Sequence, residues 1–401
     1  MGNDIGKLVN IQGFIPDRIE FHEGETKKVV VRLKREKNEY KCSGCGRRFA
    51  SFYDSRLHQA RDLPYGVWLE SWIEFERVRV DCDKCGVIVE ALDWIDTQHH
   101  YTNRLAEEVI RECGMTQSIQ QVARRLHLKW DMVKEIDKEN LQATLNPPKF
   151  DDVKYLAIDE LSVKKRHRYA TAIVDAIRHR VLWVVKNRTQ ESLSEFYKVF
   201  GEENCKKIKA AAMDMWPAYE AATREYCPQA EIVYDQFHII RDYGLVISSV
   251  RSQEAKRAPK KDKEAYMGTK YLLLANRGRY RKEEERSRLQ KLLDLNRRLS
   301  VVYILKDELK ELWRFTYEGA ARRWFEGWYR KAIYSRIEPL KEFARSLKCH
   351  LSGILAHCRH KLNTSFLEGM INKVKVIKRV AYGFRDQEYF FLKIRGAFAG
   401  C

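Results

Sequence analysis

The sequence predicts an α/β protein whose mixed β-sheet is split by an all-helical insertion and preceded by a cysteine-rich module and a helical pair. Three observations support this fold class. Short apolar runs cluster between residues 154 and 234, residues 241–350 are basic and lack strand-like runs, and four cysteines form two matching pairs before residue 90. The expected domains are residues 1–98, 99–148 and 149–400.

The predicted sheet is a succession of strands that deliver carboxylates to one edge. The expected order is β-β-β-α-β-α-β, at residues 154–159, 168–177, 180–185, 190–200, 208–213, 216–227 and 231–234. Asp159, Asp214 and Asp235 stand at the ends of the first, fourth and fifth strands. Open α/β sheets bind their ligands at the carboxyl ends of the strands, so the three acids should meet there. This layout is that of a ribonuclease-H-like fold.

The overall charge favours a polyanionic partner. The chain has 75 Lys and Arg against 56 Asp and Glu, a formal net charge of +19, which favours nucleic acid over a basic but unrelated enzyme. The helical insertion at residues 241–350 either contributes to that binding or is merely a set of solvated helices. The sequence has no bilayer-length apolar run and no signal peptide at residues 1–10, so we expect a cytoplasmic protein with reduced thiols and no membrane partner.

Four cysteines predict a structural zinc site. Cys42 and Cys45 form one C-x-x-C pair, Cys82 and Cys85 form another, and a glycine follows each pair. Four thiolates paired in this way suit a tetrahedral Zn²⁺ ion that stabilises a domain with little core. A strand at residues 68–80 would return the chain to the first pair. Free thiols and a redox pair remain the alternatives.

A helix-turn-helix is predicted between residues 103 and 141. A first helix at residues 103–113 ends at a glycine, and Ser118 begins a capping-box sequence before a helix at residues 119–126. A turn leads to a second helix at residues 130–141, which would enter a DNA major groove with its lysines facing outward. A helical hairpin without a DNA role would give the same pattern. The candidate DNA contacts here are Lys129, Lys134 and Lys138.

A helix at residues 361–380 carries one further carboxylate. Its apolar residues form a continuous face, and Glu368 lies roughly opposite that face among polar and basic neighbours. Such a residue either completes the acidic cluster or is an ordinary exposed glutamate. The candidate DNA contacts on this helix are Asn372, Lys375, Lys378 and Arg379.

Several short motifs, in this order, resemble the ISL-three family of bacterial insertion-sequence transposases. They are Ile158-Asp159-Glu160, Met213-Asp214-Met215-Trp216 with Tyr219, Asp235-Gln236-Phe237-His238, Asn363-x-x-x-x-Glu368-Gly369, and Lys375-x-x-Lys378-Arg379-x-x-Tyr382-Gly383. The resemblance covers nearly the whole chain. It implies a DDE transposase with Asp159, Asp214 and Glu368 as the catalytic triad. It also implies a supporting or strand-contacting role for Asp235 and His238, for which a structural ion pair remains the alternative.

The resemblance also implies a reaction and its partners. Three clustered carboxylates repel one another, and two Mg²⁺ or Mn²⁺ ions would relieve that repulsion and act on an in-line phosphoryl displacement. The expected partners are the terminal inverted repeats of the element, target DNA, and further copies of the chain in a homo-oligomer. A catalytically inactive DNA-binding regulator and a nuclease of the same superfamily are the competing hypotheses.

Overall fold

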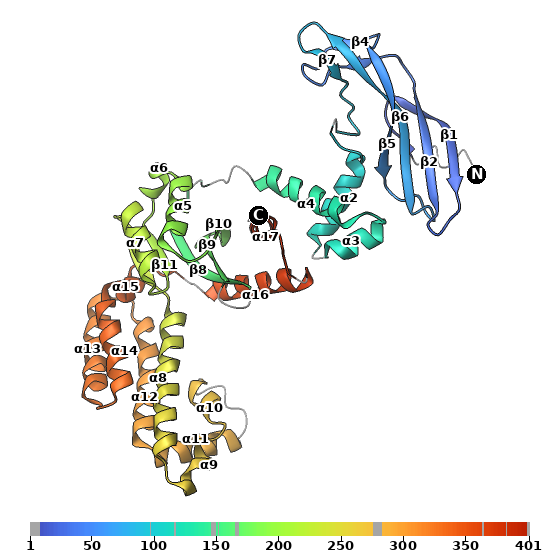
Figure 1. Cartoon of the computed structure of the whole chain (residues 1–401). Helices are drawn as coiled ribbons and strands as arrows, with labels where there is room; N and C mark the ends of the chain where they lie inside the picture. Colours follow the sequence, from blue (N-terminus) through green and yellow to red (C-terminus); the bar gives the residue numbers. More distant parts are fainter. Residues whose placement is uncertain are drawn as a thin grey trace. The chain divides into compact units, whose positions relative to one another are not determined.

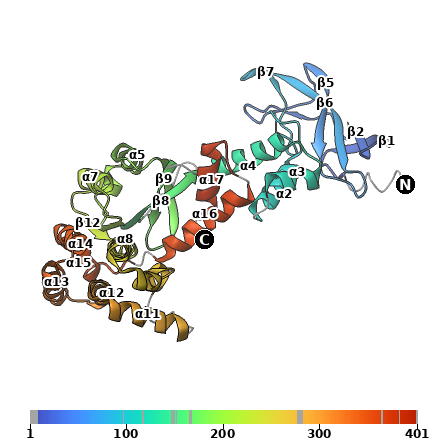
Figure 2. The same cartoon turned by 60° about the horizontal axis from the view of Figure 1, so that its bottom comes forward.

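The protein divides into two compact units. The computed structural model describes residues 9–96, 98–115, 118–145, 150, 152–164, 168–275, 283–362, 365–381 and 383–398. The first unit comprises residues 1–146 and 376–392, and the second comprises residues 147–375 and 393–401. Figures 1 and 2 label the elements of both. Residues 376–392 cluster with the N-terminal unit, and the expected domain boundaries stay a prediction.

The first unit contains a five-stranded sheet with the order β1-β2-β6-β5, and β7 pairs with β6. The strands are β1 (Phe14–His22), β2 (Lys28–Arg35), β5 (Asp54–Asp62), β6 (Glu70–Cys82) and β7 (Gly86–Val89), with β3 (Tyr40–Lys41) and β4 (Arg48–Phe49) as a separate pair. Alternating residues of β6, among them Ile73 and Phe75, are fully buried on one face. Only β6 was anticipated from the sequence, as residues 68–80.

Three helices follow this sheet in the same unit: α2 (Asn103–Gly114), α3 (Ile119–Leu126) and α4 (Trp130–Leu145). The capping box predicted at Ser118 is confirmed, because its side chain accepts from Gln121 N and the Gln121 side chain accepts from Ser118 N. Their common core includes Val122, Leu126, Val133 and Ile136. A buried carboxylate links sheet and helices: Asp62 accepts from Thr102 Oγ1 at 2.6 Å and from Arg104 Nε at 2.8 Å.

The second unit is built on the mixed sheet that the sequence predicts, in the order β10-β9-β8-β11-β12. Its strands are β8 (Tyr155–Lys164), β9 (Arg168–Asp175), β10 (Arg180–Lys186), β11 (Ala210–Met213) and β12 (Glu231–Tyr234). The helices between them are α5 (Gln190–Phe200), α6 (Glu202–Cys205) and α7 (Pro217–Tyr226). β11 pairs in parallel with both β8 and β12, whereas β8, β9 and β10 are antiparallel. Helices α5 and α7 pack side by side, joined by a 2.9 Å hydrogen bond between Tyr197 and Thr223 (Figures 1 and 2).

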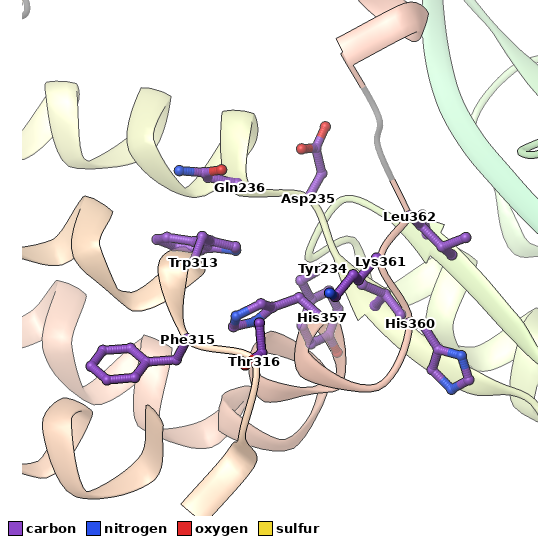
Figure 3. Close-up of a pocket in the computed structure, with 12 residues that line it drawn as sticks. Tyr234, Asp235, Gln236, Trp313, Phe315, Thr316, His357, His360, Lys361 and Leu362 are labelled. Atoms are coloured by element: carbon purple, nitrogen blue, oxygen red, sulfur yellow. The ribbon is translucent and has the colours of Figure 1, made fainter. Parts of the chain in front are cut away.

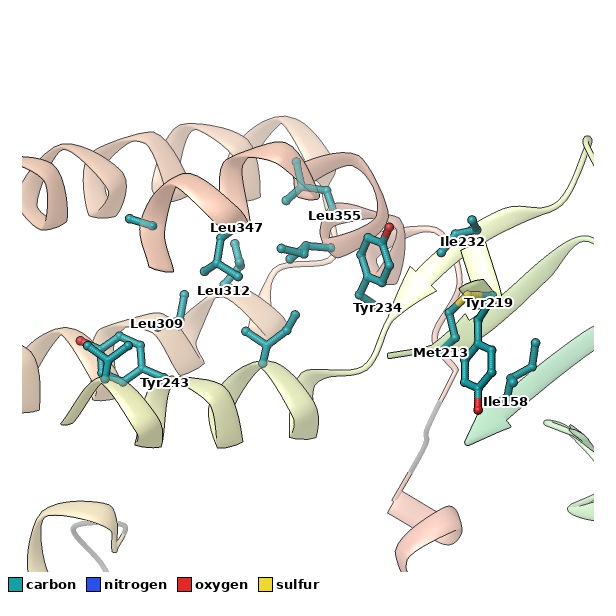
Figure 4. Packing of buried hydrophobic residues seen from close by; sticks show 14 of the residues in the cluster. Ile158, Met213, Tyr219, Ile232, Tyr234, Tyr243, Leu309, Leu312, Leu347 and Leu355 are labelled. Carbon is teal, nitrogen blue, oxygen red and sulfur yellow. The ribbon is translucent and has the colours of Figure 1, made fainter. Parts of the chain in front are cut away.

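A helical insertion follows β12 and shares its core with the sheet. Its elements are α8 (Gln236–Arg257), η1 (Lys260–Asp262), α9 (Lys263–Tyr266), α10 (Lys270–Leu274), α11 (Glu283–Leu295), α12 (Arg297–Lys310), η3 (Glu311–Arg314), α13 (Glu318–Tyr334), α14 (Glu338–Cys349), α15 (Leu351–Leu355) and η4 (Ala356–Cys358). One hydrophobic cluster runs from Ile158 and Met213 in the sheet to Leu309 and Leu347 in the insertion (Figure 4). The insertion is therefore held by continuous apolar packing against the sheet domain.

Two helices complete the chain, α16 (Ser365–Val380) and α17 (Gln387–Ala397). At the start of α16, the Phe366 ring stacks on His179 in the β9–β10 turn, with 4.0 Å between ring centroids. Within the described part of the chain, no helix has the length and apolar character needed to cross a membrane.

Candidate functional site

Two of the predicted acids lie where the parallel part of the sheet stops. Asp159 is within β8 and not at its end, which corrects the sequence-based placement, because β8 continues to Lys164. However, β11 pairs with β8 only as far as Ala157, and Asp214 directly follows β11. Both carboxylates therefore reach the same sheet edge from neighbouring strands.

His238 joins these acids from the first turn of α8. Asp235 caps this helix, since its Oδ1 accepts a 2.9 Å hydrogen bond from Phe237 N. The cap places His238 one turn along, where its Nδ1 contacts Asp214 and lies 3.2 Å from Asp235 Oδ2. Asp159, Asp235 and His238 are all at most 8% exposed. We call Asp159, Asp214, Asp235 and His238 the acid cluster.

The protonation of the acid cluster follows from its burial and its charges. Burial raises the pKa of Asp159 to about 7, against the opposing effect of the nearby His238 charge. Burial alone would lower the pKa of His238, but its contacts with Asp214 and Asp235 outweigh burial and raise the value to about 10. His238 is thus a cation at neutral pH that holds two carboxylates close together.

The carboxylates of Asp159 and Asp214 suit a divalent cation. One ligand atom each from Asp159, Asp214 and His238 lie within 4.8 Å of one another. Although Asp214 Oδ1 and His238 Nδ1 are buried and in contact, neither forms a hydrogen bond of normal geometry with any described residue. Carboxylate oxygens are the ligands that Mg²⁺ and Mn²⁺ prefer, whereas imidazole is more typical of softer metals. The two aspartates therefore fit such an ion better than His238 does.

A cleft of about 240 Å³ opens beside the acid cluster. Its lining includes Asp214, His238, Arg188 and Arg241. Arg188 is fixed by an ion pair with Glu160 at 2.8 Å and by the Trp216 ring, 4.4 Å from the guanidinium carbon. Neither arginine was predicted from the sequence, because neither stands in a short recognisable pattern. They supply positive charge next to the carboxylates, which suits a phosphodiester substrate.

Glu368 is not brought to the acid cluster. It lies in the first turn of α16 with an exposed side chain. Among the described residues, the groups placed to share a metal ion include Asp159 and Asp214 but not Glu368. The third member of the predicted triad therefore stays a prediction.

The four cysteines converge in the first unit. The Sγ atoms of Cys42, Cys45, Cys82 and Cys85 all lie within 4.8 Å of one another, and Cys45 and Cys82 are 3.6 Å apart. Four ligands at about 2.3 Å from a tetrahedral Zn²⁺ ion are about 3.8 Å from each other. The cysteine arrangement is thus compatible with structural zinc.

Glycines allow the two C-x-x-C-Gly segments, residues 42–46 and 82–86, to bring their thiols together; we call these segments the first and second knuckles. Gly46 and Gly86 each follow the second cysteine of a pair, at φ of +76° and +74°, where other residues are strained. Gly44 lies so close to Cys85 that an added Cβ would be 2.9 Å from its Sγ. The backbone of the first knuckle therefore wraps tightly around the thiol of the second.

The predicted DNA-contacting lysines of α4 have protein partners. Lys134 Nζ is 2.9 Å from Asp386 Oδ2, and Lys138 Nζ is 3.1 Å from the same atom and 2.7 Å from Glu388. Both lysines are half-buried, so the expectation that they face outward is wrong. The physical reason is that Asp386 and Glu388 form ion pairs with these lysines, and Tyr389 of α17 also donates a hydrogen bond to Asp137 of α4.

The remaining candidate contacts are mostly exposed. Lys129, in the turn before α4, is exposed, and so are Asn372, Lys375 and Arg379 on α16, whereas Lys378 is half-buried. Lys375 Nζ donates a 3.2 Å hydrogen bond to Asn372 Oδ1. A surface-exposed pair of this kind is easily exchanged for a phosphate contact.

A helix-turn-helix in one unit and a carboxylate cluster beside an arginine-lined cleft in the other are features of an enzyme that acts on DNA. A family model described as a transposase matches residues 156–394, and the helix-turn-helix domain of transposase family ISL3 matches residues 90–139. The transposase for insertion sequence element IS1001 of Bordetella parapertussis is 40% identical over 396 residues, covering 97% of this chain and 96% of the relative. The chain belongs to the ISL3 family of transposases.

More distant relatives agree with this assignment. The transposase for insertion sequence element IS1557 from two Mycobacterium tuberculosis strains, CDC 1551 / Oshkosh and ATCC 25618 / H37Rv, is 26% identical over 402 aligned positions. That alignment covers 92% of this chain and 89% of each relative. The similarity therefore includes the cysteine module, the helix-turn-helix, the sheet and the insertion.

Proposed function

We propose that this transposase cleaves DNA at the ends of an insertion sequence and joins the freed ends to target DNA in a divalent-metal-dependent reaction. The observation that carries the proposal is the convergence of Asp159 and Asp214, from adjacent parallel strands, beside a cleft lined by Arg188 and Arg241. The ribonuclease-H-like reading of the sheet supports the same chemistry. Divalent cations held by the acids would activate the attacking oxygen and stabilise the leaving oxygen.

The protein's own groups prepare the site for a phosphodiester. His238 keeps Asp214 and Asp235 close together despite their like charges, so the carboxylates are already assembled before a substrate arrives. Arg188 and Arg241 hold non-bridging phosphate oxygens, and the ion pair with Glu160 restrains the Arg188 side chain. In this proposal Asp235 and His238 are positioning residues.

Glu368 is proposed as the third acid. It would reach the acid cluster through a shift of the first turns of α16, which contact the sheet domain through Phe366 and His179. Its charge would be drawn inward by cations already bound to Asp159 and Asp214.

The first unit is proposed to recognise the terminal inverted repeats. Zn²⁺ bound by the four cysteines would stabilise the sheet module, and α3 and α4 would read the DNA sequence. Recognition of two ends also makes action as a homo-oligomer the natural arrangement. The competing hypotheses differ in chemistry: an inactive regulator binds the ends without cutting, and a nuclease cuts without joining.

The test is cleavage and joining of labelled element-end DNA with Mg²⁺ or Mn²⁺. Asp159→Asn and Asp214→Asn each remove a ligand charge with little change in shape. The expected loss is about a thousandfold or more in cleavage rate, corresponding to about 4 kcal/mol, with end binding retained. Asp294→Asn, an exposed carboxylate in the insertion, is the matched control and should cleave normally. Wild-type-like cleavage by either site variant would remove that residue from the catalytic group.

A further inference from the structure

A second pocket has Asp235 in its lining and lies between the sheet and the helical insertion (Figure 3). Its volume is about 300 Å³, at the small end of the range for ligand sites. The pocket is lined by Ala212, Val233, Tyr234, Asp235, Gln236, Trp313, Phe315, Thr316, His357, His360, Lys361 and Leu362. The strand ends of β11 and β12 form one wall, and η3, η4 and residues 360–362 form the others.

The pocket has an aromatic wall with an unused hydrogen-bond donor. The rings of Trp313 and His357 lie 6.2 Å apart between centroids, inclined by 37°. The indole Nε1 of Trp313 is buried and has no acceptor among the described residues. An indole N–H is a donor only, and a buried donor without an acceptor costs free energy. An acceptor at the edge of the indole ring, in line with the N–H, would remove that cost, and a flat group could stack on the face of the same ring.

The remaining polar groups of the pocket include a lysine cation and several side chains that can donate hydrogen bonds, besides the carboxylate of Asp235. Lys361 is exposed at its mouth, and Thr316 and Gln236 also present exposed polar side chains. The Nε2 atom of His360 is buried and, although 3.4 Å from Glu231, forms no hydrogen bond with a described residue. A flat aromatic ligand rich in acceptors, with a phosphate next to it, matches these groups. A nucleotide has this combination.

The position of the pocket connects it with the proposed reaction. Asp235 lines the pocket and also contacts His238, which contacts Asp214 in the acid cluster. Ala212, two residues before Asp214 on β11, belongs to the pocket wall as well. A nucleotide adjoining the phosphodiester at the acid cluster is thus the part of the DNA nearest to this pocket.

We propose that the pocket binds one unpaired nucleobase of the DNA end, stacked on Trp313, with Lys361 contacting the adjoining phosphate. The inference rests on the proposed cleavage of element ends and adds a subsite to it. Bases in an intact duplex do not expose their faces, so the base must leave the helix to enter. Stacking of a base on an aromatic side chain is sequence-tolerant, which leaves the choice of site to the helix-turn-helix.

The experiment is a binding cycle without added Mg²⁺ or Mn²⁺ and without a chelator, so that no cleavage occurs and the proposed zinc site stays loaded. Duplexes carrying the terminal repeat are made with a single abasic residue at each position around the cleavage site, and their affinities are measured with wild type and Trp313→Leu. At one position, Trp313→Leu should weaken binding of the intact duplex about 5- to 150-fold and leave binding of the abasic duplex unchanged. Trp313→Phe, which keeps an aromatic ring without the N–H, should lose less.

Controls separate this inference from folding and from the proposed function. Tyr334→Leu removes an aromatic residue of the insertion that is 80% exposed and outside the pocket, and it should bind all duplexes like wild type. The base site would be overturned if Trp313→Leu lost the same affinity, relative to wild type, on every abasic duplex. It would also be overturned if neither Trp313 variant bound the intact duplex more weakly than wild type. Mg²⁺-dependent cleavage by wild type is measured separately. If wild type cleaves but the loss caused by Trp313→Leu is the same for intact and abasic duplexes, only the base site is overturned. If that loss disappears at one abasic position but wild type does not cleave, only the proposed reaction is overturned.

Discussion

Replacing Gly44 with alanine should weaken zinc binding without touching a cysteine. A Cβ at this position would lie 2.9 Å from Cys85 Sγ, 3.3 Å from Cys85 Cβ and 3.5 Å from Ile88 Cδ1. Ordinary contact begins at 3.4 Å, so the thiol must retreat by about 0.5 Å from the position in which it meets the other three cysteines. Metal–ligand distances tolerate only about 0.2 Å. We therefore expect zinc affinity to fall about 10- to 100-fold, the range found when groups supporting a metal ligand are altered.

The assay is competition for Zn²⁺ between the full-length protein and a chromophoric chelator at pH 7. Wild type should retain one Zn²⁺ per chain, and Cys85→Ser should retain none. Gly24→Ala is the matched control, because its added Cβ would meet only Thr26 O, at 3.9 Å. Wild-type zinc affinity in Gly44→Ala would show that the first knuckle does not constrain Cys85. Absence of zinc from wild-type protein prepared without chelator would refute the zinc site itself.

Three further predictions concern DNA binding and stability. Lys375→Ala should weaken binding to end DNA and random DNA alike and reduce the log–log salt slope by about one; a loss confined to end DNA would contradict a phosphate contact. Asp62→Ala should lower the free energy of urea unfolding by about 3 kcal/mol, because it leaves Arg104 without its buried partner, whereas an unchanged unfolding curve would show that the pair is not stabilising. Burial opposes ionisation of Asp386, but hydrogen bonds from Tyr389 N and two α4 lysines lower its pKa to about 2. A carboxyl group whose pKa is lower in the folded state stabilises the fold at pH values above its unfolded pKa of about 4. Asp386→Asn should therefore lower the free energy of unfolding by about 1 kcal/mol at pH 7. In unfolding experiments the difference between the two proteins should shrink as the pH falls from 4 to 2.

Several features of the fold and of the candidate sites could be predicted from local sequence patterns. The two C-x-x-C pairs, the capping box at Ser118 and the succession of strands from β8 to β12 could be identified from the sequence, because each depends on residues a few positions apart. Turn geometry, helix capping and apolar alternation are properties of short segments. The carboxylates Asp159 and Asp214 were candidates for the same reason, since each closes or interrupts a short apolar run.

Only the tertiary structure decided which side chains meet. His238 reaches Asp214 because the cap of α8 and the end of β11 lie side by side, and Arg188 enters the cleft from the loop before α5. The helical pattern places Lys134 on the outward face, yet its side chain forms an ion pair with Asp386, which lies more than two hundred positions later in the sequence. Such contacts depend on packing between distant segments, and no periodicity within either segment encodes the partner.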